Sequence, residues 1–270
     1  MILSAAGGDV FNIKDLYPIK ILDIQIPDVV FTQKYTGPQF GVKGLRKEFN
    51  ITKRPLLIGP VKPCVGMNST DFAARAFQAL KGGTDIVKDD ELICNPPYNN
   101  LEERVKSVVT ATREAEQVTG EKKMYFSFIG GGSPKEIMES AAKAKALGVD
   151  GYMIAPTING IEIIRDLKEF NLPIIAHNAL WYAMHTKYHG ISFSVFAQFQ
   201  RFCGADIVIS PAPYGTFEVM TQEEHIKSTE KLLQKSDLVE STFPAFCGGQ
   251  SPKTIPYLRK DVGSNDFIVV

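Results

Sequence analysis

The stretch "TDIVKDDELICNPPYNN", residues 84–100, joins a short β-branched run to a dense group of charges. The letters "TDIVK" are typical of a buried strand, and Lys88, Asp89, Asp90 and Glu91 follow one another at its end. Charged side chains in this position have two interpretations. They form either an acidic helix start that Lys88 neutralises or a metal site at a strand end, and the fold of the surrounding chain bears on the choice.

The same succession of strand and helix repeats along the chain from residue 56. Short β-branched or aromatic runs are each followed by a longer stretch with helical periodicity. The predicted strands are 56–61, 84–88, 124–128, 151–155, 172–177, 206–210, 242–247 and 266–270. The predicted helices are 69–81, 101–119, 134–147, 160–170, 192–203, 221–235 and 252–260. This succession predicts the α/β class and a (β/α)8 barrel, the TIM-barrel fold.

The two ends of the chain depart from this succession. Residues 19–31 alternate like an extended segment or a short edge strand, and residues 37–49 are typical of a turn followed by a short helix. We therefore expect a connector over residues 1–55 and the barrel over residues 56–270. Because the eighth predicted strand runs to Val270 with no helix after it, we expect the barrel to be truncated at strand eight.

The composition narrows the class of protein. Formal net charge is zero over 270 residues, which indicates neither a nucleic-acid surface nor a membrane patch. No apolar run reaches the ~18 residues that a membrane span requires. The four cysteines lie far apart without a CxxC pair, and this favours a reduced, cytoplasmic setting over a disulfide framework.

Polar residues and glycines close several of the predicted strands. In barrels of this type the active site forms at the carboxyl ends of the strands. The residues found there are Lys62, Lys88, His177, Ser210 and the pair Gly248–Gly249. Each alone has an ordinary explanation as a salt-bridged rim residue, a satisfied core histidine or a turn. Together they predict a functional site at one rim.

The acidic run suggests the chemistry of this site. Asp90 and Glu91 offer the hard oxygen ligands that Mg²⁺ prefers. Lys88 as an ammonium would repel such an ion, but as a carbamate formed with CO2 it would become a third anionic ligand. That reaction needs the neutral amine, and therefore burial that lowers the lysine pKa. The acidic helix start remains an equal alternative at this point.

The motif "GGTDIVKDDE", residues 82–91, resembles the activation segment of the RuBisCO large subunit. The resemblance continues in the family's order and spacing through "GPQFGVKGLRKEF", "RPLLIGPVKPCVGM", "PIIAHNAL" and "FPAFCGGQSP". It implies the family's catalytic barrel domain, with residues 1–55 leading from an amino-terminal domain that we expect to be missing here. It also implies a homodimer, since in this family the amino-terminal domain of a partner subunit completes the active site.

The resemblance assigns roles to individual residues. By this match Lys88 is the lysine that carries CO2 as a carbamate, and Asp90 and Glu91 complete the Mg²⁺ ligands. Lys62 corresponds to the active-site lysine that closes strand one, and His177 to the strand-five histidine. Lys62, His177 and Lys88 are therefore expected to be catalytic.

The same resemblance implies a binding region for a phosphorylated, sugar-like substrate. Gly248 and Gly249 correspond to a turn after strand seven whose backbone binds phosphate. Asn178 and Ser210 stand beside it at the ends of strands five and six, and we expect both to contact the substrate.

The chain departs from the carboxylase pattern inside this region. Cys64 replaces a second lysine, Asn178 replaces an arginine, Ile209 stands at a histidine position, and Cys247 replaces a serine. The stretch "SPAPYGTFEVM", residues 210–220, lacks the lysine that carboxylases hold over CO2. A carboxylase cannot easily lose the cation that stabilises the new carboxylate, so CO2 fixation is not expected.

The pattern is instead similar to the RuBisCO-like proteins of form IV. Residues 202–215 are similar to 2,3-diketo-5-methylthiopentyl-1-phosphate enolase, which implies Mg²⁺-assisted enolisation or isomerisation. Residues 88–105 are closer to decarboxylases of the apionate pathway, which act on a 3-oxo sugar-acid phosphate. A third alternative is a fragment or pseudoenzyme without turnover.

Overall fold

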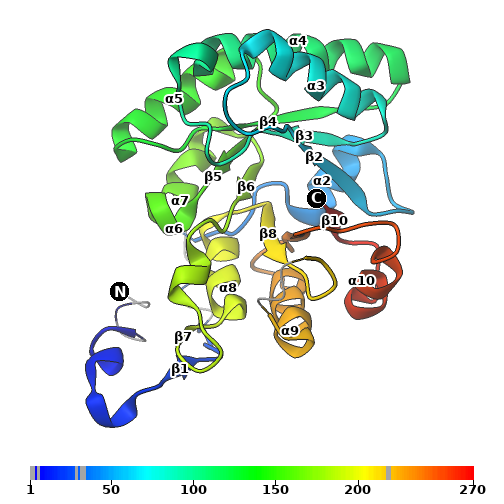
Figure 1. The fold of residues 1–270 in the computed structure, drawn as a ribbon. Helices are drawn as coiled ribbons and strands as arrows, with labels where there is room; N and C mark the ends of the chain where they lie inside the picture. Colours follow the sequence, from blue (N-terminus) through cyan, green and yellow to red (C-terminus); the bar gives the residue numbers. More distant parts are fainter. Residues whose placement is uncertain (1–3, 5–6, 28–29, 31–34, 217–219) are drawn as a thin grey trace.

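The computed structural model describes residues 4, 7–27, 30, 35–216 and 220–270. Eight parallel strands close into a barrel, with helices packed around its outside (Figure 1). The strands are β2 (Leu56–Pro60), β3 (Ile86–Lys88), β4 (Met124–Phe128), β5 (Gly151–Ile154), β6 (Ile174–Ala176), β8 (Ile207–Pro211), β9 (Phe243–Cys247) and β10 (Ile268–Val269). All eight predicted strands are present, and the predicted TIM-barrel fold is confirmed.

Helices connect successive strands of the barrel. They are α3 (Ser69–Lys81), α4 (Leu101–Thr119), α5 (Pro134–Ala146), α6 (Pro156–Asn159), α7 (Ile163–Leu167), α8 (Phe193–Cys203), α9 (Gln222–Leu233) and α10 (Ile255–Val262). Only the prediction of one helix over 160–170 needs correction. Gly160 has φ +87°, which ends α6, and α7 then continues as a 3-10 turn, Lys168–Phe170.

Local side-chain and backbone contacts fix several helix ends. The Ser133 hydroxyl caps α5, and Glu136 completes a capping box, so two amide groups at the helix start are satisfied. The Asn100 side chain caps α4 by accepting a hydrogen bond from the amide of Glu103. Gly120 ends α4 in the left-handed conformation. These caps fix where each helix begins relative to the strand before it.

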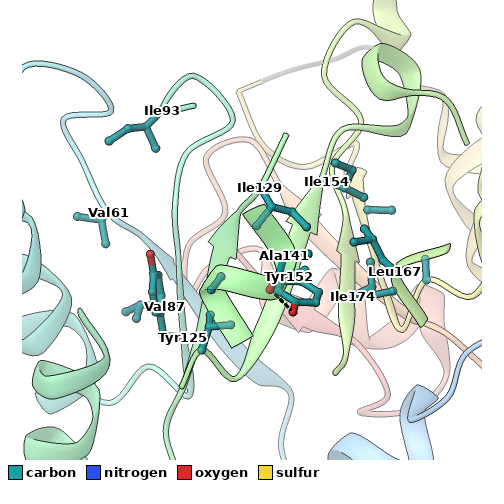
Figure 2. Close-up of a cluster of buried hydrophobic side chains, with 14 of the residues drawn as sticks. Val61, Val87, Ile93, Tyr125, Ile129, Ala141, Tyr152, Ile154, Leu167 and Ile174 are labelled. Atoms are coloured by element: carbon teal, nitrogen blue, oxygen red, sulfur yellow. Dashed lines mark hydrogen bonds between the residues drawn. The ribbon is translucent and has the colours of Figure 1, made fainter. Parts of the chain in front are cut away.

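Alternation along the strands separates two apolar cores. Ile86 and Met124 point into the barrel, whereas Val87 and Tyr125 point toward the helices. Figure 2 shows the outer core, where the Tyr152 hydroxyl donates to the carbonyl of Ala141 at 2.7 Å. Burying each large apolar side chain contributes about 1.5–3 kcal/mol. Burial of these apolar side chains therefore stabilises the barrel independently of the polar side chains at the strand ends.

The strand register aligns the carboxyl ends of β2, β3 and β4. Pro60 pairs with Lys88, and Lys88 pairs with Phe126. Consequently Lys62, which follows β2, and Asp90, which follows β3, emerge at the same edge of the barrel. This register is what brings residues far apart in the sequence to one rim.

The segment before the barrel packs against the inner core and against the start of β8. Helix α2 (Gly41–Phe49) places Leu45 and Phe49 in the inner core. The Asp206 carboxylate, at the start of β8, accepts hydrogen bonds from the amides of Phe40 and Gly41, both at 2.8 Å. The expected turn and short helix over 37–49 are thus present.

The predicted extended segment, 19–31, is only partly realised. A short strand, β1 (Lys20–Ile21), pairs in parallel with β7 (Gly190–Ile191) outside the barrel. Residues 28–29 and 31 of the prediction lie outside the described residues. Among the helices that the structure describes, none has both the length and the apolar character needed to cross a membrane.

Candidate active site at the barrel mouth

Four of the predicted site residues form two close side-chain contacts at the barrel mouth. The Lys62 ammonium contacts the Asp90 carboxylate, and His177 Nε2 lies 3.2 Å from Glu91 Oε2. Lys62 follows β2 and His177 follows β6, so the acidic segment after β3 is contacted from two different strands. Lys88 is buried near these residues, with only 3% of its surface exposed.

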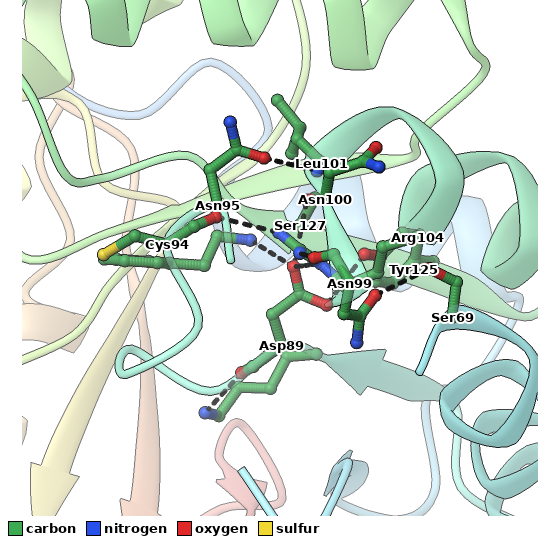
Figure 3. A network of polar contacts seen from close by, with 12 residues as sticks. Ser69, Asp89, Cys94, Asn95, Asn99, Asn100, Leu101, Arg104, Tyr125 and Ser127 are labelled. Carbon is green, nitrogen blue, oxygen red and sulfur yellow. Dashed lines mark hydrogen bonds and ion pairs between the residues drawn. The ribbon is translucent and has the colours of Figure 1, made fainter. Parts of the chain in front are cut away.

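Asp89 anchors the acidic segment from the other side of the sheet (Figure 3). Its Oδ2 accepts hydrogen bonds from Arg104 Nε at 3.0 Å, Ser127 Oγ at 3.0 Å and the Phe128 amide at 2.9 Å. Its Oδ1 accepts one from the Tyr125 hydroxyl at 2.7 Å. The side chains of Asp89 and Arg104 are completely buried. Asp89 is therefore a structural residue, fully satisfied by strand β4 and helix α4.

The anchor explains why the neighbours of Asp89 face the mouth. Adjacent residues on an extended chain point to opposite sides, so fixing Asp89 toward α4 turns Lys88 and Asp90 inward. Arg104 also donates to the carbonyls of Asn99 at 2.7 Å and Cys94 at 3.3 Å, which holds the rest of the loop. The role of Asp89 was not inferred from the sequence, because nothing local pairs it with an arginine fifteen positions later on α4.

Burial gives Lys88 the property that carbamate formation requires. Desolvation lowers the pKa of Lys88, against the opposing influence of Glu91 and Asp90. Its Nζ donates to the carbonyl of Asp89 at 3.1 Å. A lysine in this environment reaches the neutral amine state more readily than one in water, and the neutral amine is the form that reacts with CO2.

Lys62 and Asp90 shift each other's pKa in opposite directions. Partial burial acts to lower the pKa of Lys62, but the hydrogen bond and charge of Asp90 outweigh it, so the pKa is raised. For Asp90, burial acts to raise the pKa, and the Lys62 and Leu92 hydrogen bonds reverse this, so its pKa is lowered. Lys62 is thus a protonated ammonium as long as Asp90 contacts it. A general base needs the neutral amine instead.

His177 is neutral at the barrel mouth. Burial lowers its pKa to about 3, and the charges of Lys88 and Lys62 act in the same direction. Its Nδ1 accepts a hydrogen bond from the amide of Ala179 at 3.2 Å, so the neutral ring carries its proton on Nε2, the nitrogen that lies 3.2 Å from Glu91 Oε2. In this tautomer His177 is a hydrogen-bond donor toward the mouth.

We expect the imidazole of His177 to remain neutral between pH 8 and pH 5. A pKa lowered from 6.5 to about 3 means that protonation is postponed to strongly acidic solution. The measurement is the pH titration of imidazole carbon-bound protons by NMR, with His177→Gln identifying the resonance. A His177 resonance that titrates with a midpoint near 6.5 would contradict this description of the site.

The remaining predicted residues occupy the neighbouring strand ends. Asn178 is buried, and its amide donates to the carbonyl of Ile209 and accepts from Gln200, both at 2.5 Å. Ser210 is also buried, and its hydroxyl donates to the carbonyl of Pro211 at 3.2 Å. Both side chains make their described contacts within the protein, so their predicted contact with substrate stays a prediction.

Gly248 and Gly249 form a turn directly after β9. Their φ angles are +95° and +82°, in the region that glycine adopts without strain. The Gly248 carbonyl accepts hydrogen bonds from the amide of Thr216 at 2.6 Å and from its hydroxyl at 3.1 Å. The turn is therefore in contact with the segment after β8, and phosphate binding by its backbone stays a prediction.

The donors at the mouth fit a hard metal ion only with a modified lysine. Among the described residues, no group of three histidine, cysteine, aspartate or glutamate side chains is arranged to hold a metal. Asp90 and Glu91 supply two carboxylates, and Lys88 lies buried beside them. A carbamate on Lys88 would supply the third oxygen ligand. In this structure Lys62 contacts the Asp90 carboxylate, and His177 lies against the Glu91 carboxylate.

A cavity of about 780 Å³ lies outside this group of residues. It is lined in part by Lys20, His185 and Glu224, where Glu224 Oε2 lies 3.6 Å from Lys20 and 3.7 Å from His185. These contacts join β1 and the loop before β7 to the start of α9. None of the predicted metal ligands lines this cavity, so the candidate site rests on the strand ends rather than on this cavity.

The fold and the polar strand ends together define a TIM-barrel protein with a candidate metal site at the carboxyl face. The chain belongs to the family described as ribulose bisphosphate carboxylase large chain, catalytic domain, which matches residues 41–270. The resemblance inferred from the motifs is thereby confirmed.

Two relatives and one solved structure illustrate this membership. A ribulose bisphosphate carboxylase-like protein of Archaeoglobus fulgidus is 34% identical over all of this chain and 61% of its own length. A 2,3-diketo-5-methylthiopentyl-1-phosphate enolase of Bacillus pumilus is 31% identical over 93% of this chain and 62% of its own length. The octameric carboxylase/oxygenase of Pyrococcus horikoshii OT3 superposes with a TM-score of 0.92 at 30% identity, covering 99% of this chain and 63% of that one.

Proposed function

We propose that this chain is the catalytic barrel of a RuBisCO-like protein that enolises a phosphorylated, sugar-derived substrate with Mg²⁺ and does not fix CO2. The observation that carries the proposal is the burial of Lys88 beside Asp90 and Glu91, with Lys62 and His177 facing the same two carboxylates. Similarity to an enolase at 31% identity supports this class of reaction. The chain spans just over three fifths of the length of these two relatives. The proposed activity is therefore that of the whole protein and not of this stretch alone.

Carbamylated Lys88, Asp90 and Glu91 would hold the magnesium ion. When bound there, Mg²⁺ would supply Lewis-acid polarisation of adjacent substrate oxygens and so acidify the carbon-bound proton between them. Asp89 takes no part in this binding, because the hydrogen bonds of its carboxylate all come from β4 and α4. Its task is to keep Lys88 and Asp90 turned to the mouth.

Lys62 is the residue best placed to move the proton. Its side chain is 56% exposed and reaches into the mouth from β2. The Asp90 carboxylate is what raises its pKa, so engaging Asp90 elsewhere frees the amine to accept a proton. His177, neutral and protonated on Nε2, would donate a hydrogen bond to an oxygen of the substrate. The two side chains thus divide proton transfer and oxygen stabilisation between them.

The same mouth lacks the groups that carboxylation needs. Ile209 places an apolar side chain in the middle of β8, and Asn178, after β6, is an internally bonded amide. The segment from Pro211 to Met220 contains no lysine. Removing one group that stabilises developing negative charge typically costs on the order of 3 kcal/mol, or ~100-fold in rate. Enolisation without carboxylation is the reaction that these residues can support.

We further propose that the whole protein works as a homodimer or a larger homo-oligomer. Solved relatives are described as octameric for Pyrococcus horikoshii OT3 and dimeric for Hyperthermus butylicus. A cytoplasmic location accords with the free cysteines Cys64, Cys94, Cys203 and Cys247. Size-exclusion chromatography with light scattering would measure the state of assembly.

The experiment follows solvent hydrogen into the substrate. The protein is supplied with 2,3-diketo-5-methylthiopentyl 1-phosphate, deuterated water, Mg²⁺ and CO2. We expect deuterium in the sugar phosphate only with Mg²⁺, and no radiolabelled CO2 in phosphoglycerate when ribulose bisphosphate is the substrate. Labelled phosphoglycerate would refute the proposal. CO2 release from a 3-oxo sugar-acid phosphate would support the decarboxylase alternative, and no turnover with any of these would support a pseudoenzyme.

A further inference from the structure

The segment that follows β8, residues 212–216, is held at its middle by a buried carboxylate. The Tyr214 hydroxyl donates to Asp261 Oδ2 on α10 and accepts a hydrogen bond from Gln222 Nε2 at 2.8 Å. Gln222, the first residue of α9, also donates to Asp261 Oδ1 at 3.0 Å. Helices α9 and α10 are neighbours in the outer layer (Figure 1), so this clamp joins the segment to both.

The surroundings of Asp261 make the clamp strong. Its side chain is only 4% exposed, and His225 Nε2, on a completely buried ring, lies 3.9 Å away. Burial lowers the pKa of His225 to about 4, so this imidazole is neutral and supplies no cation. Tyr214 and Gln222 are therefore the hydrogen-bond donors that satisfy the Asp261 carboxylate among the described residues. Hydrogen bonds to a buried carboxylate are shorter and stronger than those between neutral groups.

The far end of the segment lies on the candidate phosphate turn. The Thr216 amide and hydroxyl both donate to the Gly248 carbonyl, at 2.6 Å and 3.1 Å. A Cβ added to Gly215 would overlap the same carbonyl, so no space separates the two segments. A Cβ added to Gly249 would lie 2.7 Å from Thr216 Oγ1, which places the Thr216 side chain directly against the turn.

We infer that Tyr214 is a positioning residue that fixes the 212–216 segment as a permanent wall of the Gly248–Gly249 turn. The hydrogen bond to Asp261 holds Tyr214 in place. Because Gly215 and Thr216 follow directly in the chain, they are thereby kept against the Gly248 carbonyl. The turn thereby keeps one shape before and after a ligand arrives. The inference rests on the proposed function only for the identity of that ligand, a phosphate group, and not for the clamp itself.

Hydrogen exchange followed by mass spectrometry tests whether the Tyr214–Asp261 hydrogen bond holds the 212–216 segment in place. In the unaltered protein we expect the Thr216 amide to be protected, and in Tyr214→Phe to exchange about ten-fold faster, which is the scale of one lost hydrogen bond to a charged group. The matched control is Tyr257→Phe, because that ring packs on Tyr214 with centroids 5.4 Å apart without a described hydrogen bond of its own. Equal exchange in the unaltered protein and Tyr214→Phe, or equal acceleration in the control, would overturn the inference.

Inorganic phosphate is the probe for the consequence at the turn. We expect Tyr214→Phe to weaken phosphate binding by about ten-fold in calorimetry, while Tyr257→Phe leaves it unchanged. In the full-length enzyme the same variant should raise KM more than it lowers kcat, since the wall binds rather than reacts. Unchanged phosphate affinity in Tyr214→Phe would overturn the positioning role. If the unaltered protein binds no phosphate, phosphate binding by the Gly248–Gly249 turn is refuted. The hydrogen-exchange experiment then remains the test of whether Tyr214 holds the 212–216 segment.

Discussion

Arg104→Met should destabilise the protein by about 3–5 kcal/mol, the usual cost of removing one partner from a buried ion pair. Asp89 would be left in the interior without its cationic partner, because both side chains of the pair are completely buried. The Arg104 guanidinium also holds the carbonyls of Asn99 and Cys94, and these would lose their partner. Chemical denaturation followed by circular dichroism measures the change in the free energy of unfolding.

Two controls separate this effect from a general loss of charge on α4. Lys106→Met removes a cation from the same helix whose partner, Glu102, is exposed, and it should leave stability nearly unchanged. Adding Asp89→Asn to Arg104→Met should recover part of the loss, because the unpaired buried charge disappears. Equal stability of Arg104→Met and Lys106→Met would show that the pair does not anchor the acidic segment.

Mg²⁺ binding should depend on both CO2 and Lys88, and this is the second large effect that we expect. Lys88→Met removes the amine but leaves an apolar side chain that suits a position with 3% exposure, so the fold should survive. Without the carbamate oxygen the site loses one of three anionic ligands, and affinity should fall by roughly 10–100-fold. Calorimetric titration with Mg²⁺, with and without bicarbonate, measures this dependence.

Asp90→Asn provides the comparison for Lys88→Met. It removes an anionic ligand while preserving shape, and it also removes the partner that raises the pKa of Lys62. We expect weaker Mg²⁺ binding at any CO2 concentration, whereas Lys88→Met should bind equally weakly with and without CO2. Unchanged Mg²⁺ affinity in either variant would contradict the assignment of that residue as a metal ligand. Labelled bicarbonate would report the carbamate directly by carbon NMR.

The sequence by itself determined the fold and the identity of the strand ends. Runs such as "MYFSF" and the helical period of residues 101–119 match β4 and α4 residue for residue. This succeeded because strands buried on both faces are continuously apolar, and because the longer stretches between them show helical periodicity. The motif around Lys88 also sufficed to identify the family, since its spacing is specific.

Only the tertiary structure decided which charges meet. The sequence predicted Asp90 and Glu91 as ligands but indicated no role for Asp89, and the structure pairs Asp89 with Arg104 while Asp90 and Glu91 lie at the mouth. The neutral state of His177 likewise follows from burial among lysines that come from other strands. The Tyr214 clamp joins positions 214, 222 and 261, which share no local pattern. Pairings of this kind depend on strand register and helix placement, because electrostatic contacts act over a few ångströms of space and leave no periodic trace along the chain.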